Sequence, residues 1–405
     1  MLNQAGVPVE SFAEPMRWDS ERPTLICFSH LRWNFVFQRP QHLMSRFAED
    51  MAVVYWEEPC DIGPNETPYL QMREAEGFPS VRVVVPHLPQ GLGEEQRATS
   101  LKGLLDAHVA NLNGPLIAWY YTPMMLPFSR HLDASVLVYD CMDELSKFRF
   151  APEGLLELEQ ELIDKADLVF TGGSSLYEAK KDRHASVHLF PSSVDRAHFG
   201  KARTAIEDPA DQAKLAHPRL GFFGVIDERF DIDLLDSIAA MRPDWSFVMV
   251  GPVAKIAPED LPQRPNIHYL GPKTYNQLPS YLAGWDVALM PFAMNESTQF
   301  ISPTKTPEYL AGGKPVVSTP VKDVVRHYGQ LEGVLIAGDA ESFVAACETA
   351  LELSKDRGGQ WLAEADLLLS ATSWHTTQAR MAGLIAKVLG TRTVQTSPAL
   401  LVAAE

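Results

Sequence analysis

The chain has 405 residues, of which 46% are hydrophobic and 21% charged, and its net charge is −17. This length exceeds that of a typical single core, so the composition predicts a globular protein of two domains. Lys and Arg number 19 against 28 Asp and Glu in residues 1–205, and 16 against 24 in residues 206–405. Neither half is cationic, which excludes nucleic acid as an expected partner, because binding it needs a basic surface.

The four cysteines are far apart in the sequence and form no CxxC pair, so neither a zinc site nor a redox motif is indicated. The N-terminal residues lack the apolar segment of a signal peptide. No apolar run approaches the roughly 18 residues of a membrane span. We therefore expect reduced thiols and a cytoplasmic protein, which contacts the inner face of a membrane only peripherally.

In the first half of the chain, apolar strand patterns alternate with helical patterns. Residues 1–22 are polar and irregular, and we expect them to be poorly ordered. The alternation that follows indicates a parallel, doubly wound sheet. The expected strands are 24–30, 51–59, 81–86, 116–121, 135–140 and 167–172, with helices near 95–112 and 153–166.

A second α/β series follows a polar stretch, 200–217, that is predicted to be a linker. Its expected strands are 219–224, 246–251, 266–271, 286–292, 314–319 and 333–338. The last amphipathic pattern predicts a helix over 373–390, with a disordered tail at 391–405. The expected organisation is thus an α/β domain over 23–205, a second over 206–372, and a final helix.

The most informative stretch is NESTQFISPTKTPEYLAGGKPVVSTP, residues 295–320. Thr306 suits a helix N-cap and Pro307 the first helical position, while one of two following glycines can end the helix in a left-handed conformation. Free N–H groups point out of such a helix start, with Lys305 just before it and Glu308 in its first turn. The lysine suits a diphosphate, and the carboxylate can accept hydrogen bonds from a ribose. An ordinary loop-helix-strand unit with a surface lysine is the alternative.

The pattern PxKxxEYLAxGKPVV in this stretch resembles the nucleotide-sugar site of retaining GT-B glycosyltransferases, and is similar to bacterial teichuronic-acid and capsule-type members. The resemblance covers roughly residues 24–390 and implies two facing Rossmann-like domains, with a last helix that crosses back to the first. It implies transfer of a sugar from a nucleoside diphosphate, UDP- or GDP-linked, to a saccharide or lipid-linked acceptor hydroxyl in cell-surface polysaccharide synthesis. Glu308 matches the second glutamate of the family's E-x7-E motif. Pro303, Thr304 and Thr306 accompany Lys305 and Glu308 as expected donor contacts.

Ligands of open parallel sheets bind beyond the carboxyl ends of strands, and this rule selects the other candidate residues. In the loop after the first strand these are His30, Asn34 and Arg39, which in the resembled enzymes would face the cleft; the alternative is that they tie the loop down. We expect loss of Arg39 to reduce turnover more than stability.

Two further loops supply the remaining expected catalytic groups. Asp140 and Asp143 could bind sugar hydroxyls or could cap a helix. Arg229 suits two-point contact with a diphosphate or belongs to a surface ion cluster. Lys305, Asp143 and Arg229 are the predicted catalytic residues. The turn that holds the nucleobase in the resembled enzymes offers Lys273 and Tyr275 here, although a plain turn would look the same.

Several family positions carry other residues in this chain. Phe300 stands where the first glutamate of E-x7-E falls, Met142 at a histidine position, and Val225 and Phe230 at those of an Arg and a Lys. These departures keep two alternatives open, a catalytically inactive nucleotide-sugar-binding partner and a GT-B sugar-nucleotide epimerase. No Walker loop or GxGxxG opening is evident, and the DID at residues 231–233 follows a phenylalanine and is expected to start a helix, so neither a cofactor nor a metal is expected.

Overall fold

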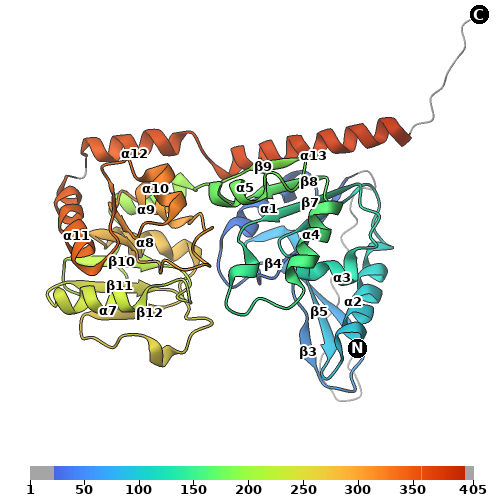
Figure 1. Ribbon diagram of the computed structural model, residues 1–405, viewed down its shortest axis with the longest axis horizontal. Helices are drawn as coiled ribbons and strands as arrows, with labels where there is room; N and C mark the ends of the chain where they lie inside the picture. The colour runs from blue at the N-terminus through green and yellow to red at the C-terminus, as the bar shows by residue number, and fades with distance from the viewer. Residues whose placement is uncertain (1–21, 357, 397–405) are drawn as a thin grey trace, which may run out of the picture.

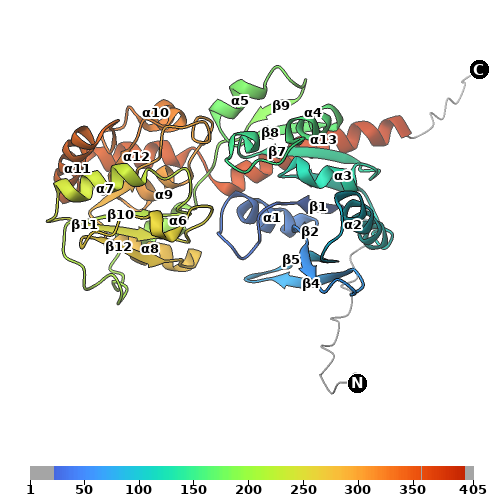
Figure 2. The same ribbon diagram turned by 60° about the horizontal axis from the view of Figure 1, so that its bottom comes forward.

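The computed structural model describes residues 22–356 and 358–396, and side chains up to residue 391. The chain forms two α/β lobes that lie side by side (Figures 1 and 2). Each lobe is built on its own, mostly parallel sheet. The two-domain α/β fold expected from the sequence is therefore confirmed.

The first sheet has nine strands in the order β3-β5-β2-β1-β6-β7-β8-β9, with β4 antiparallel to β5 beside this path. The strand order reverses direction between β1 and β6, which is the point where open α/β sheets bind ligands. The short strands β3 and β9 and the β4–β5 hairpin were not predicted, although the strand expected at 81–86 lies within β5. The bounds are β1 Thr24–Phe28, β2 Ala52–Trp56, β3 Cys60–Ile62, β4 Tyr69–Ala75, β5 Phe78–Pro89, β6 Leu116–Tyr120, β7 Val136–Cys141, β8 Leu168–Thr171 and β9 Val187–Leu189.

The second sheet has six parallel strands in the order β12-β11-β10-β13-β14-β15. This is the doubly wound order in which the direction reverses between β10 and β13. The bounds are β10 Arg219–Phe223, β11 Ser246–Val250, β12 Ile267–Gly271, β13 Val287–Met290, β14 Val316–Ser318 and β15 Val334–Ile336.

Helices cover both faces of each sheet. In the first lobe they are α1 Arg39–Asp50, α2 Glu94–Val109, η1 Pro123–Met125, α3 Leu126–Ser129, η2 Leu145–Lys147, α4 Leu155–Lys165 and α5 Ser174–Lys180. In the second lobe and its approach they are α6 Arg196–Phe199, η3 Gly200–Arg203, α7 Ile232–Met241, η4 Pro258–Asp260, η5 Tyr275–Gln277, α8 Leu278–Ala283, α9 Lys305–Ala311, α10 Lys322–Tyr328, α11 Ala340–Lys355 and α12 Gln360–Ser370. The last helix is α13 Trp374–Thr396.

Alternation along the central strands divides the first core into two layers. Leu25 and Cys27 of β1 face a cluster that contains residues of α1 and α13, whereas Ile26 and Phe28 face the layer of α2, α3 and α4. Successive strand residues point to opposite faces of a sheet, so an apolar run fully buried on both faces is what a parallel sheet requires. The second lobe has one continuous core.

The chain crosses between the lobes twice. Phe190 belongs to the first core and Val194 to the second; later, Leu369 belongs to the second core and Trp374 to the first. The two crossings touch, because the Ser193 hydroxyl lies 2.7 Å from Oγ1 of Thr377. The first crossing therefore precedes the predicted boundary between residues 205 and 206.

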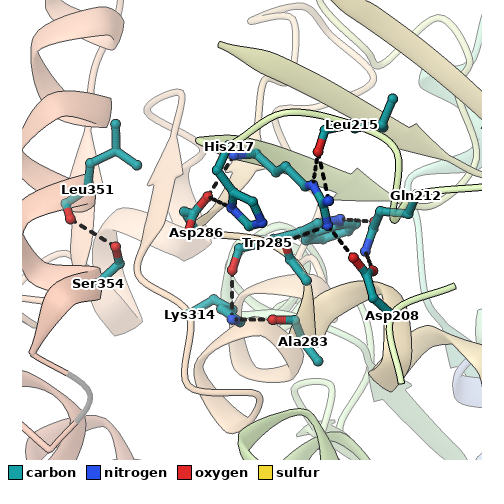
Figure 3. Close-up of polar contacts among 12 residues, drawn as sticks. Asp208, Gln212, Leu215, His217, Ala283, Trp285, Asp286, Lys314, Leu351 and Ser354 are labelled. Atoms are coloured by element: carbon teal, nitrogen blue, oxygen red, sulfur yellow. Dashed lines mark hydrogen bonds and ion pairs between the residues drawn. The ribbon is translucent and has the colours of Figure 1, made fainter. Parts of the chain in front are cut away.

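The predicted linker, 200–217, is packed against the second lobe. Gln212, which has no exposed surface, accepts a hydrogen bond from the Trp285 indole (Figure 3). It also donates a hydrogen bond to the carbonyl of Tyr281. His217 lies 2.6 Å from Asp286 in the same region. This segment is thus packed as part of the second lobe and is not a free tether.

Helix α13 packs along α1 in the first lobe and contributes Trp374, Met381 and Ile385 to its core. It extends to Thr396, so residues 391–396 of the predicted tail are helical. The predictions for 1–21 and 397–405 lie outside the described residues. Among the described helices, none is both long enough and apolar enough to cross a membrane.

Candidate functional site

A small cavity of about 90 Å³ lies where the two lobes meet. The carboxyl ends of β1 and β7 supply the loops on one side, and those of β10 and β13 lead into the loops on the other. Six of the predicted site residues line this cavity, namely Arg39, Asp143, Arg229, Pro303, Thr304 and Lys305. The other lining residues are Gln38, Met142, Gly172, Ser192, Val225, Phe292, Ile301 and Ser302.

Lys305 is the first residue of α9, whose N-cap is Thr304. The helix thus begins before the predicted N-cap, Thr306, and Lys305 is part of its first turn. Its side chain passes directly over Gly224, where an added Cβ would lie 2.2 Å from the lysine Cε. Gly224 also has φ +146°, so both the space and the backbone favour glycine there. The route of the lysine depends on this residue.

Glu308 lies behind Lys305 and is 8% exposed. Burial raises its pKa to about 8, while Lys305 and a hydrogen bond with Thr304 act in the opposite direction. Burial also lowers the pKa of Lys305, against the effect of Glu308. The two groups form a coupled buried pair in which desolvation favours the neutral forms.

Asp143 brings a carboxyl from the first lobe to this pair. Burial raises its pKa, and Asp227 acts in the same direction, whereas Arg229, Lys255 and Lys305 lower it. The fork of Arg229 is occupied, since Nε and Nη2 donate to the two oxygens of Asp227 at 3.0 and 2.7 Å. Arg229 would have to leave this pair, or share it, to bind another anion.

Lys255 belongs to the same charged group and was not selected from the sequence. It has φ +62°, the only non-glycine residue of the described chain with positive φ. Its Nζ lies 4.7 Å from the ring centroid of Phe148, a ring that also contacts Arg229 at 5.5 Å. Lys255 follows β11, so the rule that selects loops after parallel strands could have found it. Left-handed backbone at a non-glycine residue often marks a functional loop.

Arg39 lies at the wall of the cavity and pairs with Asp140 inside the first lobe. Arg39 is 3% exposed and Asp140 is fully buried. Arg39 donates to both carboxylate oxygens of Asp140, and its Nη1 donates to the carbonyl of Phe190 at 2.7 Å. For Arg39, the alternative in which it ties the loop down describes these contacts better than ligand binding. Both carboxylate oxygens of Asp140 accept from Arg39, which is neither the predicted sugar contact nor the helix cap that was its alternative.

The other predicted residues lie outside the cavity. Nδ1 of His30 is buried and has no hydrogen-bond partner in the described chain. Burial, and to a lesser extent the positive charge of Lys255, lowers the pKa of His30 to about 4. Lys273 is bound to Asp211 at 2.8 Å, and the ring of Tyr275 stacks on His198 at 4.0 Å. Asn34 is exposed, and Thr306 is buried against the sulfur of Met290. Their assigned roles stay predictions.

At four positions this chain carries a residue that differs from the one in the resembled family, and two of these residues pack in the cores. Phe300, where the first glutamate would fall, packs against the core of the first lobe, and Phe230 is 4% exposed in the second core. Met142 and Val225 line the cavity itself. Within residues 22–356 and 358–391, no three His, Cys, Asp or Glu side chains are arranged to hold a metal ion.

The sequence is similar to known glycosyltransferases. Residues 217–353 match the family model of glycosyl transferases group 1. A Bacillus subtilis (strain 168) protein, TuaH, whose name proposes it as a glycosyltransferase of teichuronic acid biosynthesis, is 28% identical over 267 residues. That alignment covers 61% of this chain and 66% of the relative, a little under two thirds of its length.

Solved structures match nearly the whole fold. Sucrose-phosphate synthase from Thermosynechococcus elongatus aligns with TM-score 0.63 and 16% identity over 92% of this chain and 100% of its own. A structure from E. coli entitled trehalose-6-phosphate, bound with UDP-2-fluoro glucose, gives 0.63 and 13% over 89% and 99%. Anabaena HepE in complex with UDP gives 0.61 and 14% over 90% and 100%. The chain thus has the GT-B fold of these enzymes, and its residues 217–353 are similar to the group 1 glycosyl transferases.

Proposed function

We propose that this protein transfers a sugar from a nucleoside diphosphate sugar to an acceptor hydroxyl. The observation that carries the proposal is the group of three cations, Lys305, Arg229 and Lys255, around Asp143 at the junction of the lobes. A diphosphate leaving group gains negative charge as the glycosidic bond breaks. Cations held in a largely dry site stabilise that charge more strongly than they would in water.

Each residue has a distinct role in this proposal. Lys305 interacts with the departing diphosphate, and Lys255 supplies a second cation from the neighbouring loop. Glu308 accepts hydrogen bonds from the ribose, as its match to the E-x7-E motif implies. Asp143 faces the sugar from the first lobe, where the acceptor binds. The phosphate role of Arg229 requires that Asp227 release or share its guanidinium.

The donor is proposed to bind the second lobe, where the group 1 match lies. A neighbour of the same fold is titled as a complex with UDP, which supports a uridine nucleotide ahead of a guanosine one. We propose that transfer retains the anomeric configuration, on the strength of the motif in residues 303–319. No metal or other cofactor forms part of the proposed reaction.

The acceptor is proposed to be a saccharide or lipid-linked saccharide of a cell-surface polysaccharide, as the name of TuaH suggests for that relative. The four cysteines are free thiols, which fits a reducing cytoplasmic compartment. Neither the inactive-partner nor the epimerase alternative is supported by these comparisons.

The test is release of nucleoside diphosphate from a panel of UDP- and GDP-linked sugars, with and without oligosaccharide acceptors. We expect slow release with water and faster release with the correct acceptor, and NMR of the product would report the anomeric configuration. Lys305→Ala provides the inactive control, and Lys214→Ala removes an exposed lysine elsewhere in the second lobe. Tight nucleotide binding with no sugar transfer for any donor would contradict the proposal.

A further inference from the structure

A groove in the described part of the chain lies away from the junction of the lobes. It has a volume of about 570 Å³ and runs between α5, β9 and α13, which lie together at one edge of the first lobe (Figure 1). This volume is within the roughly 300–1,000 Å³ of small-molecule sites. We propose that this groove binds the phosphate head group of an anionic lipid and thereby docks the first lobe on a membrane surface. The inference does not depend on the proposed sugar transfer.

Two cations of α13 line the groove. Arg380 and Lys387 are seven positions apart, about two helical turns, and so lie on the same side of the helix. The Arg380 guanidinium is 5.0 Å from the ring centroid of Phe190. His188 lines the same groove, and burial, Arg380, His184 and Lys387 all lower its pKa. Within the part of the chain that the structure describes, neither Arg380 nor Lys387 forms a hydrogen bond or ion pair with an acidic side chain.

The groove is positively charged, whereas the protein as a whole is negatively charged. The chain has 52 Asp and Glu, yet residues 374–396 contain none. No acidic residue lines the groove. An uncompensated cationic groove on a chain of net charge −17 is complementary to an anionic partner. Juxtaposed Lys and Arg are attracted to anionic lipids by about 1 kcal/mol each.

The apolar part of the groove favours a lipid over a purely polar anion. Val187 and Leu189 of β9 and Leu384 of α13 are half-buried and line it beside the cations. β9 is the outermost strand of its sheet, so backbone groups on its outer side are free of ladder pairing in the described chain. A phosphate joined to hydrocarbon would place its charge near Arg380 and Lys387 and its first carbons against these side chains.

The test is sedimentation of the full chain with vesicles of phosphatidylcholine that contain 30% phosphatidylglycerol, against vesicles of phosphatidylcholine alone. We expect binding to the anionic vesicles only. Arg380→Ala/Lys387→Ala should weaken it about 30-fold, since two contributions of about 1 kcal/mol correspond to that factor. Lys214→Ala/Lys322→Ala removes the same charge from exposed sites of the second lobe and should leave binding within about twofold.

A second pair of variants separates the groove from charge alone. Gly383 lines the groove, and a Cβ added to it meets no atom within 4 Å, so Gly383→Leu fits the helix and fills the groove without a change in charge. Gly390→Leu is the matched control on the same helix, also without a nearby atom. We expect Gly383→Leu to weaken vesicle binding at least fivefold and Gly390→Leu to leave it unchanged. The proposal is overturned by equal binding to both vesicle types, by equal losses in the two charge pairs, or by normal binding of Gly383→Leu. It is also overturned if a soluble glucuronate oligosaccharide binds this groove while vesicles do not.

Discussion

The guanidinium of Arg39 binds the carboxylate of Asp140 through two hydrogen bonds, Nε to Oδ2 at 3.0 Å and Nη2 to Oδ1 at 2.8 Å. The pair joins the first residue of α1 to the end of β7. A third bond, to the carbonyl of Phe190, joins both to the strand end that precedes the first crossing. Arg39 therefore holds together the edge of the first sheet that faces the second lobe.

Arg39→Ala should destabilise the first lobe by about 3–5 kcal/mol, because it leaves the Asp140 carboxylate buried without a partner. This replaces the expectation from the sequence, in which stability was to stay nearly unchanged. Urea unfolding would measure the loss. Arg97→Ala breaks an exposed pair with Asp61 and should cost no more than about 1 kcal/mol. Equal free energies of unfolding for the two variants would contradict the structural role.

The sequence predicted the two sheets because buried parallel strands are apolar throughout, as in β1 and β11. It missed β3 and β4, which are short or exposed and lack such a run. The helical period likewise located α13, yet the pattern could not show how far its C-terminal end extends. The residue patterns thus predicted which helices and central strands exist. The ends of these elements and the edge strands depend on tertiary contacts that no local pattern shows.

For the site, the sequence identified which loops face the cavity but not the partner of each side chain. Arg39 and Asp140 are 101 positions apart, and nothing local indicates that they bind each other rather than a ligand. The pairing of Arg229 with Asp227 was foreseen only as an alternative. Lys255 was missed because a lysine in an irregular loop carries no pattern, and its positive φ is visible only in three dimensions.

We expect the lobes to open for donor entry and to close around the bound donor, because the cavity of about 90 Å³ between them is smaller than typical ligand sites of roughly 300–1,000 Å³. The crossings at Ser193 and Thr372, rather than the packed segment 204–217, should bend. Solution scattering should show a smaller radius of gyration with nucleoside diphosphate than without it. An unchanged radius, with binding confirmed by calorimetry, would contradict closure.

A variant that removes a contact between the two lobes tests the same motion. Asp323 of the second lobe accepts bonds from the backbone and hydroxyl of Ser175, at 3.0 and 2.6 Å. Asp323→Ala should raise the radius of gyration of the free protein, since it removes contacts that exist only when the lobes are together. Lys147→Ala, which breaks an exposed interlobe pair with Glu296, should have a smaller effect.

Lys255 allows charge and backbone strain to be separated. Lys255→Ala should reduce kcat at least tenfold through loss of a cation near the diphosphate, with the left-handed backbone strain kept. Lys255→Gly should lose the same activity yet be more stable than Lys255→Ala by about 1 kcal/mol, because glycine adopts positive φ freely. Initial rates and melting temperatures would decide. Normal turnover in both variants would exclude Lys255 from the site.

Glu308 should give the stability of the protein a specific pH dependence. Burial raises its pKa to about 8 from 4.5, so the folded state keeps a proton that the unfolded state releases between these values. The stability associated with this proton is complete below about pH 4.5 and is lost as the pH rises to 8. The glutamine of Glu308→Gln cannot titrate. The free energy of unfolding of this variant, relative to that of the parent, should therefore increase from pH 5 to pH 8. Urea unfolding at several pH values measures this difference, with the exposed Glu352→Gln as control. Parallel curves for the parent and Glu308→Gln would show that the glutamate is ionised in the fold.

Lys305 and Glu308 should differ in what they contribute to the reaction. Above about pH 8, where Glu308 is ionised in the fold, its carboxylate accepts ribose hydrogen bonds in the ground state, and loss of such a charge-assisted bond costs about 1.5–3 kcal/mol. Glu308→Gln should therefore weaken binding of nucleoside diphosphate about tenfold or more, with a smaller effect on kcat. Lys305 interacts with a charge that grows in the transition state, so Lys305→Ala should lower kcat more than it weakens donor binding. The lysine also opposes the burial that keeps Glu308 protonated, so Lys305→Ala should shift the pH dependence of nucleotide binding upward, whereas Lys214→Ala should not. Calorimetry would measure binding and initial rates would measure turnover. If both variants bind nucleoside diphosphate as tightly as the parent, the donor does not bind at α9 and the roles assigned to this pair are wrong.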